Sequence, residues 1–444
     1  MPERIAVIGS GISGLSAAWL LSKSCDVSVF EANPKAGGHA NTVTVDLPDG
    51  PVAVDTGFIV YNEQNYPNLV ALFDHLEVET APSDMSFAVS TEGGGMEYCG
   101  RHLPGLFGQR RNIVRMRHWM MVADILRFFR TAEADVATVG DDMTIGAFLE
   151  RFSYSEPFVE DHILPMTAAI WSTPARSMLD FPAKTLIAFL ANHGLLQINN
   201  RPRWRTVVGG SRRYVDRLIA DGAFRLRTGM RVDRVTRRRG SPELTFAGGA
   251  SQCYDQVIFA CRADQALALL GDPSRTEEET LSAFRSTVNK AVLHTDAGFM
   301  PRRKRLWSAW NYRRTGRGND ASLSLTYWMN RLQPLPTATQ LFVTLNPMHD
   351  FAPGSVLHTV DYEHPLFDAG AIAAQREISR IQGTRRTWFA GAWLGYGFHE
   401  DGLQSGIEIA ERIGPVRRPW SVENPRGRIE HNWVEEEAPR WAAE

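Results

Sequence analysis

The residues near the N-terminus constrain the fold more than any other part of the chain. An apolar run over residues 5–8 leads into the turn Gly9-Ser-Gly11-Ile-Ser-Gly14, and a helix-like stretch follows over 15–23. A second apolar run, 27–30, ends at Glu31. In such a unit the glycines permit a tight turn, close approach of a pyrophosphate and close helix packing, while the acid accepts hydrogen bonds from ribose hydroxyls. The pattern predicts a dinucleotide site. A glycine-rich turn in some other α/β protein is the alternative, but it leaves the placement of Glu31 unexplained.

Further glycine-rich segments indicate which dinucleotide binds. Paired glycines at 37 and 38 follow Glu31, and Val54-Asp-Thr-Gly-Phe58 offers another close backbone approach. Near the other end of the chain, residues 387–391 read as a strand that ends in glycine, and residues 407–413 have helical spacing and stop at Gly414. A helix N-terminus beside residues 402–406 would favour the negative charge of a reduced flavin. These segments favour FAD over NAD.

These motifs resemble the flavin monoamine oxidase and phytoene desaturase superfamily, and the resemblance spans nearly the whole chain. More narrowly, the chain resembles a bacterial group of predicted flavoproteins. The segments that carry this narrower resemblance are residues 37–43, 55–62, 66–69, 170–172, 192–196, 209–215, 293–296, 310–312 and 397–402. The resemblance implies an α/β protein with a Rossmann-like FAD-binding domain of the amine-oxidase (GR2) type and a discontinuous α+β substrate domain.

The motifs and the resemblance together predict which residues contact the FAD, held without a covalent bond. The backbone near Val232 is included because that region meets the adenine in the resembled superfamily. The predicted FAD residues are Gly9, Gly11, Ser13, Gly14, Glu31, Ala32, Gly37, Gly38, His39, Thr56, Gly57, Phe58, Val232, Gly391, Gly402, Leu403 and Ser405.

The narrower resemblance also implies a substrate. Members of the bacterial group are often associated with cyclopropane-fatty-acid-synthase-like methyltransferases, and some desaturate a methylated acyl chain in the pathway to furan fatty acids. We therefore expect a desaturase or oxidase that transfers hydride from a methyl-branched unsaturated acyl chain of a phospholipid to flavin N5. An amine oxidase acting on a small or apolar amine is one alternative. A non-catalytic flavoprotein partner of a lipid-modifying enzyme is the other.

Composition narrows the classes of protein. A length of 444 residues favours two domains. A net charge of −2 gives no case for nucleic acid binding. Its four cysteines are scattered, which predicts free thiols in a reducing compartment, and no residues have metal-ligand spacing. The first strand begins within a few residues of Met1 and no apolar run reaches about 20 residues, so we expect a cytoplasmic protein, peripheral on the membrane. The sequence gives no indication of oligomeric state.

The cofactor domain is predicted to be discontinuous. It should comprise residues 1–80, 206–284 and 381–414, with one strand over 224–235 and another over 254–260 that returns to the parallel sheet. The substrate domain should comprise a mostly helical insert, 81–205, and a second insert, 285–380, with strands over 291–295, 322–328 and 340–345. Residues 415–444, rich in proline and tryptophan, should form an extended tail that packs on the protein.

Three sets of residues compete for a role beside the flavin. His399 and Glu400, with Tyr396 and Asp401, could supply a base, or they could only hold their loop. The second set is Tyr61 with Asn62, for which an ordinary packed tyrosine is the alternative. The third is Lys290, which we interpret as a surface lysine because the surrounding match to amine oxidases is poor. We interpret His193 and His294 as structural histidines. There is no P-loop and no nucleophile elbow.

The first insert combines apolar and basic residues over 101–130. Apolar anchors beside arginines suit an anionic membrane surface, and Leu106 and Phe107 within 101–117 are the predicted anchors. A substrate-domain helix with a buried apolar side is the alternative. The acyl substrate itself should occupy a long apolar cleft around Met166, Ile170 and Trp171.

Overall fold

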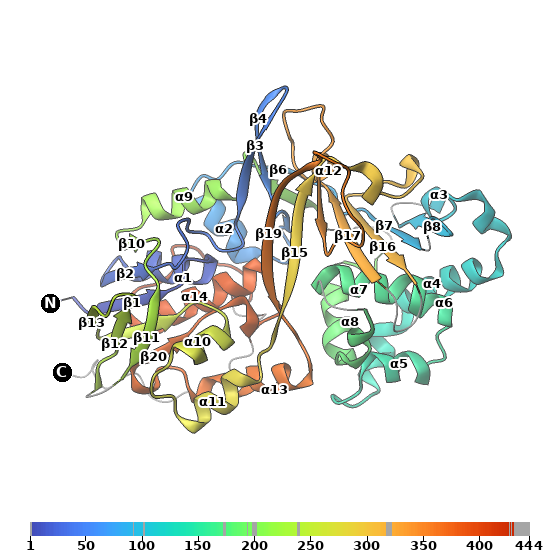
Figure 1. Ribbon diagram of the computed structural model, residues 1–444. Coiled ribbons are helices and arrows are strands. Elements are labelled where there is room, and N and C mark those ends of the chain that lie inside the picture. Colours follow the sequence, from blue (N-terminus) through green and yellow to red (C-terminus); the bar gives the residue numbers. More distant parts are fainter. Residues whose placement is uncertain are drawn as a thin grey trace. The chain divides into compact units, whose positions relative to one another are not determined.

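The chain forms two compact units, each built from segments that are far apart in the sequence. The computed structural model describes residues 2–91, 93–100, 103–171, 175–192, 194–197, 202–237, 240–316, 322–425, 427 and 429, and Figure 1 shows their elements. The described residues of 1–38, 215–285 and 370–444 form the first unit, and those of 39–214 and 286–369 form the second.

A five-stranded parallel sheet organises the first unit. Its strand order is β10-β2-β1-β14-β20, with every neighbouring pair parallel. The strands are β1 (Arg4–Ile8), β2 (Asp26–Phe30), β10 (Arg225–Arg227), β14 (Gln256–Phe259) and β20 (Thr387–Phe389). The central strands read as unbroken apolar runs because both faces of the sheet are covered. The predicted strands at 5–8, 27–30 and within 254–260 are confirmed.

Two helices pack closely against each other in this unit. They are α1 (Ile12–Leu21), which is buried along its whole length, and α14 (His399–Ile413). A Cβ atom at Gly406 would lie 2.1 Å from the carbonyl oxygen of Ser13, so only glycine permits this approach. The other helices that lie wholly in the unit are α10 (Ala263–Leu269) and α11 (Arg275–Ser282), while α9 (Arg212–Asp221) and α13 (Ala369–Glu377) begin at its borders.

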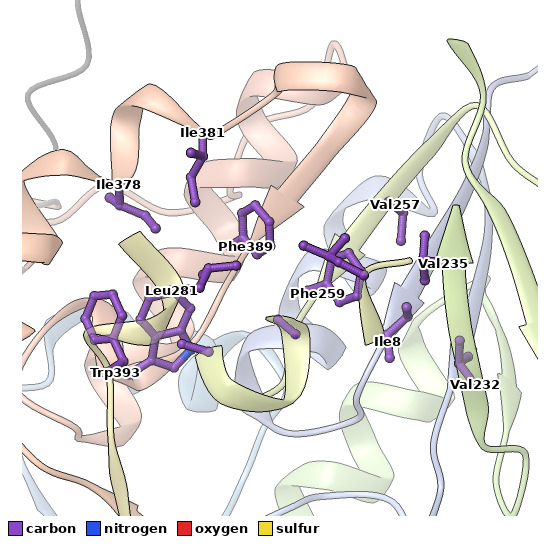
Figure 2. Close-up of a cluster of buried hydrophobic side chains, with 14 of the residues drawn as sticks. Ile8, Val232, Val235, Val257, Phe259, Leu281, Ile378, Ile381, Phe389 and Trp393 are labelled. Atoms are coloured by element: carbon purple, nitrogen blue, oxygen red, sulfur yellow. The ribbon is translucent and has the colours of Figure 1, made fainter. Parts of the chain in front are cut away.

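A buried apolar cluster joins the parallel sheet to a small antiparallel sheet. Figure 2 shows Ile8, Val257 and Phe259 from the parallel sheet with Val232 and Val235 from the small one. The small sheet has the order β11-β12-β13, with strands Val232–Thr236, Glu243–Phe246 and Ser251–Cys253. Leu281, Ile378, Ile381, Phe389 and Trp393 complete the labelled cluster.

The prediction of one strand over 224–235 is wrong. The segment forms two strands, β10 and β11, that belong to different sheets. Gly229 separates them with a φ of +67°, a left-handed conformation that interrupts a strand and that glycine adopts without strain. Alternation of apolar and polar residues on both sides of the glycine concealed this turn.

A seven-stranded sheet organises the second unit. Its order is β19-β15-β18-β17-β16-β7-β8, and only the β16–β7 pair is parallel. The strands are β7 (Phe87–Thr91), β8 (Met96–Cys99), β15 (Ser286–His294), β16 (Trp310–Thr315), β17 (Ser322–Trp328), β18 (Phe342–Leu345) and β19 (Val356–Pro365). The three strands predicted in the second insert are confirmed, and the first insert adds β7 and β8 to the same sheet.

Helices account for most of the remaining first insert. They are α3 (Leu103–Leu106), α4 (Met116–Ala137), α5 (Ile145–Arg151), α6 (Glu156–Phe158), α7 (Leu164–Trp171) and α8 (Ala183–Asn192). Elsewhere in the unit are α2 (Pro67–His75), α12 (Met329–Leu332), the hairpin of β3 (Thr42–Leu47) and β4 (Gly50–Asp55), and a sheet of β5 (Tyr61–Asn62), β9 (Trp204–Val207) and β6 (Thr80–Pro82). Within the described residues, no helix has the length and apolar character that a bilayer crossing requires.

Two features bear on the predicted boundaries. Residues 39–80 pack with the second unit, because β5 and β6 both pair with β9, whereas the sequence placed them with the cofactor segments.

In the C-terminal segment, the ring of Trp420 stacks on Trp19 at 5.8 Å. Trp433 and Trp441 lie outside the described residues. All four cysteines are free thiols.

Candidate functional site

The glycine turn of the first unit is shaped by close backbone contacts. Gly9 has a φ of +106°, and a Cβ atom there would lie 2.5 Å from the carbonyl oxygen of Ala260. A Cβ atom at Gly14 would lie 2.0 Å from the carbonyl oxygen of Gly9, so this glycine brings α1 against the turn. Both positions therefore require glycine for the fold itself.

Gly11 differs from Gly9 and Gly14 because no contact within the protein requires a glycine at this position. Its φ of −68° suits any residue, and a Cβ atom there would meet no other atom within 4 Å. Gly11 is also the N-cap of α1, which begins with no side-chain cap and no acid in its first turn. Open space beside uncapped N–H groups suits a pyrophosphate, so the turn fits the dinucleotide that the motif predicts.

Glu31 is held at the end of β2 with both carboxylate oxygens engaged. Oε2 accepts hydrogen bonds from the amide (3.0 Å) and hydroxyl (2.6 Å) of Ser10, and Oε1 accepts from the amide (2.8 Å) and side chain (3.1 Å) of Asn33. The backbone donors orient the carboxylate, whereas the two side-chain donors can rotate away and leave acceptor sites for ribose hydroxyls. The adjacent Ala32 is exposed.

The paired glycines fold back onto the turn. The amide of Gly37 donates to the carbonyl oxygen of Ser10 at 3.0 Å, and Gly38 has a φ of +56°. A Cβ atom at Gly38 would lie 3.1 Å from the Cα atom of Gly11. The pair therefore lies against the same turn in the first unit, as close backbone approach requires.

The C-terminal glycines Gly402 and Gly406 pack against other parts of the first unit, and the predicted FAD contact of Gly402 stays a prediction. Helix α14 begins at His399, not near residue 407, so Gly402 and Gly406 lie inside the helix. A Cβ atom at Gly402 would lie 2.8 Å from Cγ2 of Ile12, which explains the glycine by helix packing. The helix starts early because Oδ2 of Asp401 accepts hydrogen bonds from the amides of Tyr396 (3.1 Å) and Phe398 (2.8 Å).

Other predicted residues of this region lie around that helix start. Ser405 is buried, and its hydroxyl accepts a hydrogen bond from the amide of Gly391 at 3.0 Å. Leu403 is buried in the same helix. Glu400 is fully buried and accepts a hydrogen bond from Gln404 at 3.1 Å, while His399 is half-buried. Glu400 and Asp401 thus contribute to holding this segment, and a catalytic role for His399 or Glu400 stays a prediction.

The predicted FAD residues of the second unit surround His39. The amide of Phe58 donates to the carbonyl oxygen of His39 at 2.7 Å, and a Cβ atom at Gly57 would lie 2.2 Å from that oxygen. The hydroxyl of Thr56 lies 2.8 Å from that of Tyr362. The structure therefore brings His39, Thr56, Gly57 and Phe58 together, whereas the other predicted FAD residues belong to the first unit.

Two residues that the sequence did not indicate, Tyr362 and His364, pack on this loop. The ring of Tyr362 stacks on His39 with centroids 5.1 Å apart, and the ring of His364 lies 5.4 Å from the same histidine. Nδ1 of His364 lies 3.0 Å from Nδ2 of Asn289, and burial, with a smaller effect of His39, lowers the pKa of His364 to about 3. Both residues lie on β19, more than 300 residues from Thr56 along the chain. The only local sign of a shared role was that Tyr362 and His364 occupy alternate positions of one strand and so lie on the same face of the sheet.

Asp55 links several segments of the second unit. Its fully buried carboxylate accepts hydrogen bonds from Thr42 (2.6 Å), from the amide and hydroxyl of Ser211, and from Gln333 (2.8 Å). Burial raises the pKa of Asp55 to about 6, although these donors oppose the shift. Asp55 thereby ties the β3–β4 hairpin to the segments that contain Ser211 and Gln333.

The remaining candidates have structural explanations. Tyr61 is buried, with its ring edge-on to Phe73 at 5.3 Å, as expected of a packed tyrosine, and its catalytic role stays a prediction. Oδ1 of Asn62 accepts from the amide of Asn65 at 2.8 Å. Lys290 is exposed on β15, in agreement with its interpretation as a surface lysine. His193 lies outside the described residues. Within the described residues, no cluster of side chains could hold a metal ion.

His294 is a structural histidine with a defined tautomer. Its Nδ1 accepts a hydrogen bond from the amide of Asp296 at 3.1 Å, so Nε2 carries the proton and donates to Thr344 at 2.7 Å. Burial lowers its pKa to about 4. The interpretation drawn from the sequence is confirmed.

This burial predicts a pH dependence of stability. Below pH 6.5 the unfolded histidine binds a proton, whereas the folded one does so only near pH 4. The contribution of neutral, buried His294 to the free energy of unfolding is therefore fully present above pH 6.5. It is lost as the pH falls toward 4, by roughly 3 kcal/mol in total. Chemical denaturation at a series of pH values should show a shallower loss over this range in His294→Gln than in the parent protein. Equal slopes would contradict the assignment.

A parallel sheet, an uncapped helix behind a glycine turn and an acid after the second strand define a dinucleotide-binding protein by class. Residues 12–414 match the family described as flavin containing amine oxidoreductase, and the chain belongs to this family. The cofactor is therefore FAD, and the match confirms the FAD-dependent oxidoreductase class that the sequence predicted.

Known proteins show where the similarity lies. The chain is 51% identical to mitochondrial protoporphyrinogen oxidase of Nicotiana tabacum over 45 residues, which are 10% of this chain and only 9% of that protein. A putative protoporphyrinogen oxidase from Exiguobacterium sp. 255-15 has a similar structure, with a TM-score of 0.68 at 14% identity, covering 93% of this chain and 98% of that one.

Two further solved structures share the fold. A CLA-producing fatty acid isomerase from P. acnes has a TM-score of 0.66 at 14% identity, covering 93% of this chain and 98% of that one. Cyclohexylamine oxidase from Brevibacterium oxydans IH-35A has a TM-score of 0.63 at 16% identity, covering 93% and 100%. At these identities the likeness shows the fold alone, and it confirms the predicted amine-oxidase-like α/β architecture.

Proposed function

We propose that the protein oxidises a long apolar substrate, specifically that it desaturates a methyl-branched unsaturated acyl chain carried by a phospholipid. Bound FAD would supply the hydride acceptor, flavin N5. The uncapped start of α1 would bind its pyrophosphate and Glu31 its ribose. His399 would accept the proton that leaves the substrate, since a neutral imidazole is a suitable base near neutral pH.

The partners of the buried carboxylates in the second unit favour a neutral substrate over an amine. An ammonium substrate is usually bound by a buried anionic group, because an unpaired buried charge is costly. Three carboxylates are buried in the described part of the second unit, and each is already bonded to residues of that unit. The partners are Thr42, Ser211 and Gln333 for Asp55, Arg303 for Glu97, and Arg117 and Arg314 for Asp161. None of these three is left over to bind an amine, and this favours a neutral chain.

The predicted lining residues are consistent with an apolar substrate. Met166 is buried in α7 and Ile170 is half-buried, while the side chain of Trp171 lies outside the described part. Neutral groups of this kind bind an acyl chain through buried area, at about 25 cal/mol per Å². The fatty acid isomerase of similar fold acts on such a chain according to its name, which adds support to the proposal.

A substrate test separates the three candidate functions. Mixed anaerobically with a phospholipid that carries a methyl-branched monounsaturated chain, the flavoprotein should lose its oxidised flavin absorbance. Mass spectrometry should find an acyl chain lighter by two hydrogen atoms. Cyclohexylamine and putrescine, at the same concentration, should leave the flavin oxidised.

The other outcomes identify the alternatives. Reduction by an amine, with an aldehyde as product, would establish an amine oxidase. If no lipid or amine reduces a flavin that dithionite still reduces, the non-catalytic alternative is favoured. His399→Gln should lower the rate of flavin reduction by the lipid by about a hundredfold while the flavin content is retained, which tests the assigned base.

A further inference from the structure

Most of the large apolar side chains exposed in the described residues are concentrated on one segment of the second unit. Six of the eight lie between residues 113 and 126, where the 3₁₀ turn Arg110–Val114 leads into α4. They are Ile113 (52% exposed), Val114 (86%), Met116 (74%), Trp119 (47%), Met120 (45%) and Leu126 (39%). Exposed apolar clusters of this kind on a folded protein indicate an interaction site.

The outer face of α4 carries large apolar residues over its first three turns, although the inner face already forms core. Met116, Trp119 or Met120, and Leu126 recur at helical spacing on the exposed side, while Met121, Val122, Ile125 and Phe128 are buried on the other. A helix that only covered a core would carry polar residues outside.

The anchors predicted from the sequence, Leu106 and Phe107, are not part of this exposed set. Both are half-buried, and the ring of Phe107 packs on Trp119 at 4.8 Å and on His118 at 5.4 Å. The indole of Trp119 donates to the carbonyl oxygen of Ile113 at 2.8 Å, which holds the 3₁₀ turn against α4. Phe107 therefore supports the exposed apolar residues from beneath.

A basic pocket adjoins this apolar segment. It has a volume of about 470 Å³ and is lined by Gly93, Gly94, Gly95, Arg111, Arg302 and Arg303. Arg111, at the start of the 3₁₀ turn, donates to the carbonyl oxygen of Gly94 at 3.2 Å, and a Cβ atom at Gly94 would lie 2.8 Å from Cδ of Arg302. Arg111 and Arg302, which are 191 residues apart in the sequence, thus line one pocket.

The charge of the pocket is only partly neutralised. Arg303 pairs with the buried Glu97 at 2.5 Å, whereas no described carboxylate forms an ion pair with Arg111 or Arg302; Glu92 lies outside the described residues. Lys304 and Arg305 continue the basic run and are exposed. Volume and charge suit a phosphate-bearing headgroup, because arginine binds phosphate oxygens through two donors at once.

We propose that this surface docks the protein on an anionic phospholipid bilayer. The docking surface consists of an apolar part (Ile113, Val114, Met116, Trp119, Met120) and a basic part (Arg111, Arg302, Arg303, Lys304, Arg305). The apolar part enters the interfacial region of the bilayer, and the basic pocket binds a lipid phosphate beside it. Apolar and basic groups side by side match the two layers of a bilayer surface, whereas a soluble anion would leave the apolar part exposed. The proposal stands on this surface and does not require the acyl substrate.

Vesicle flotation of the flavin-loaded protein tests the proposal. We expect binding to phosphatidylcholine vesicles that contain phosphatidylglycerol, weaker binding without it, and a loss of the difference at high salt. Val114→Ser/Met116→Ser should lower binding to both vesicle types at least about tenfold. Arg111→Gln/Arg302→Gln should lower binding to the anionic vesicles roughly tenfold or more and remove the preference for them.

Matched controls come from elsewhere on the chain. Val288 and Val356 are the other two large apolar residues exposed in the described part, so Val288→Ser/Val356→Ser should bind as the parent does. Arg275→Gln removes an exposed arginine of α11 and should also leave binding unchanged. Flavin content should stay constant throughout, since no substituted residue is among the predicted FAD residues.

Three results would overturn the proposal. One is equal flotation of the parent and Val114→Ser/Met116→Ser. Another is a parent dimer that this double variant dissociates while vesicle binding is unaffected, which would make the apolar part an interface between two copies. The third is binding of inorganic phosphate by a protein that does not bind vesicles of either type, which would make the pocket a soluble-anion site.

Discussion

A Gly11→Val variant should purify folded but colourless. The valine side chain projects from a position where a Cβ atom meets no protein atom within 4 Å and where φ is −68°, so the chain itself tolerates it. The space it fills is the space beside the uncapped N-terminus of α1, where the pyrophosphate of FAD binds in this fold. We expect FAD affinity to fall at least about a hundredfold, equivalent to about 2.7 kcal/mol. Flavin absorbance per protein measures the loss, and circular dichroism measures folding.

Two other glycines provide the contrast. Gly100→Val places a side chain where a Cβ atom also meets nothing, in the second unit, and should leave the flavin content intact. Gly14→Ala should fail at folding instead, because its Cβ atom would lie 2.0 Å from the carbonyl oxygen of Gly9. A yellow Gly11→Val protein with full flavin occupancy would refute the position of the pyrophosphate.

Arg237→Met should destabilise the protein by about 3–5 kcal/mol, the cost of leaving one partner of a buried ion pair alone. Arg237 and Glu277 have fully buried side chains and bond through two pairs of atoms, the second at 3.0 Å. Arg237 also bonds Asp272 at 3.0 Å. Burial by itself would raise the pKa of Glu277, but the hydrogen bonds from Arg237 and Ser274 outweigh it and lower this pKa.

The lowered pKa sets the pH dependence of this effect. The stabilisation is present above the ordinary glutamate pKa of 4.5 and is lost as the pH falls through the lower folded value. The difference in unfolding free energy between parent and Arg237→Met should therefore be largest near neutral pH and shrink in acid. Urea denaturation followed by fluorescence measures it.

Two further variants distinguish the effect of breaking the buried Arg237–Glu277 pair from the effect of removing an arginine elsewhere. Arg275→Ala breaks the exposed pair with Glu279, whose side chains are 90% and 64% accessible, and should leave the free energy of unfolding unchanged, because water screens an exposed ion pair. Arg237→Met/Glu277→Leu should recover much of the loss by removing the stranded carboxylate. A single variant as stable as the parent would show that the pair contributes nothing.

The sequence alone determined the dinucleotide unit and the family. Gly9, Gly14 and Glu31 lie close together along the chain, and the steric demands that they meet are local, so a strand, turn and helix could be predicted at their observed positions. The strands of the second insert followed from their apolar alternation for the same reason. The local pattern was misleading where two strands follow each other, as around Gly229. It was also misleading where a helix begins earlier than its apolar spacing suggests, as at His399.

Only the tertiary structure decided which distant segments share a surface. Tyr362 reaches the loop of Thr56 through the pairing of β19 with β15, and Arg302 reaches Arg111 through the packing of the Gly93–Gly95 loop. The sequence indicated a segment suited to a membrane surface and predicted Leu106 and Phe107 as its anchors. Both are half-buried, because the exposure of a side chain depends on which distant residues pack against it. Composition records which groups a segment carries, whereas contacts over hundreds of residues determine which of them face water.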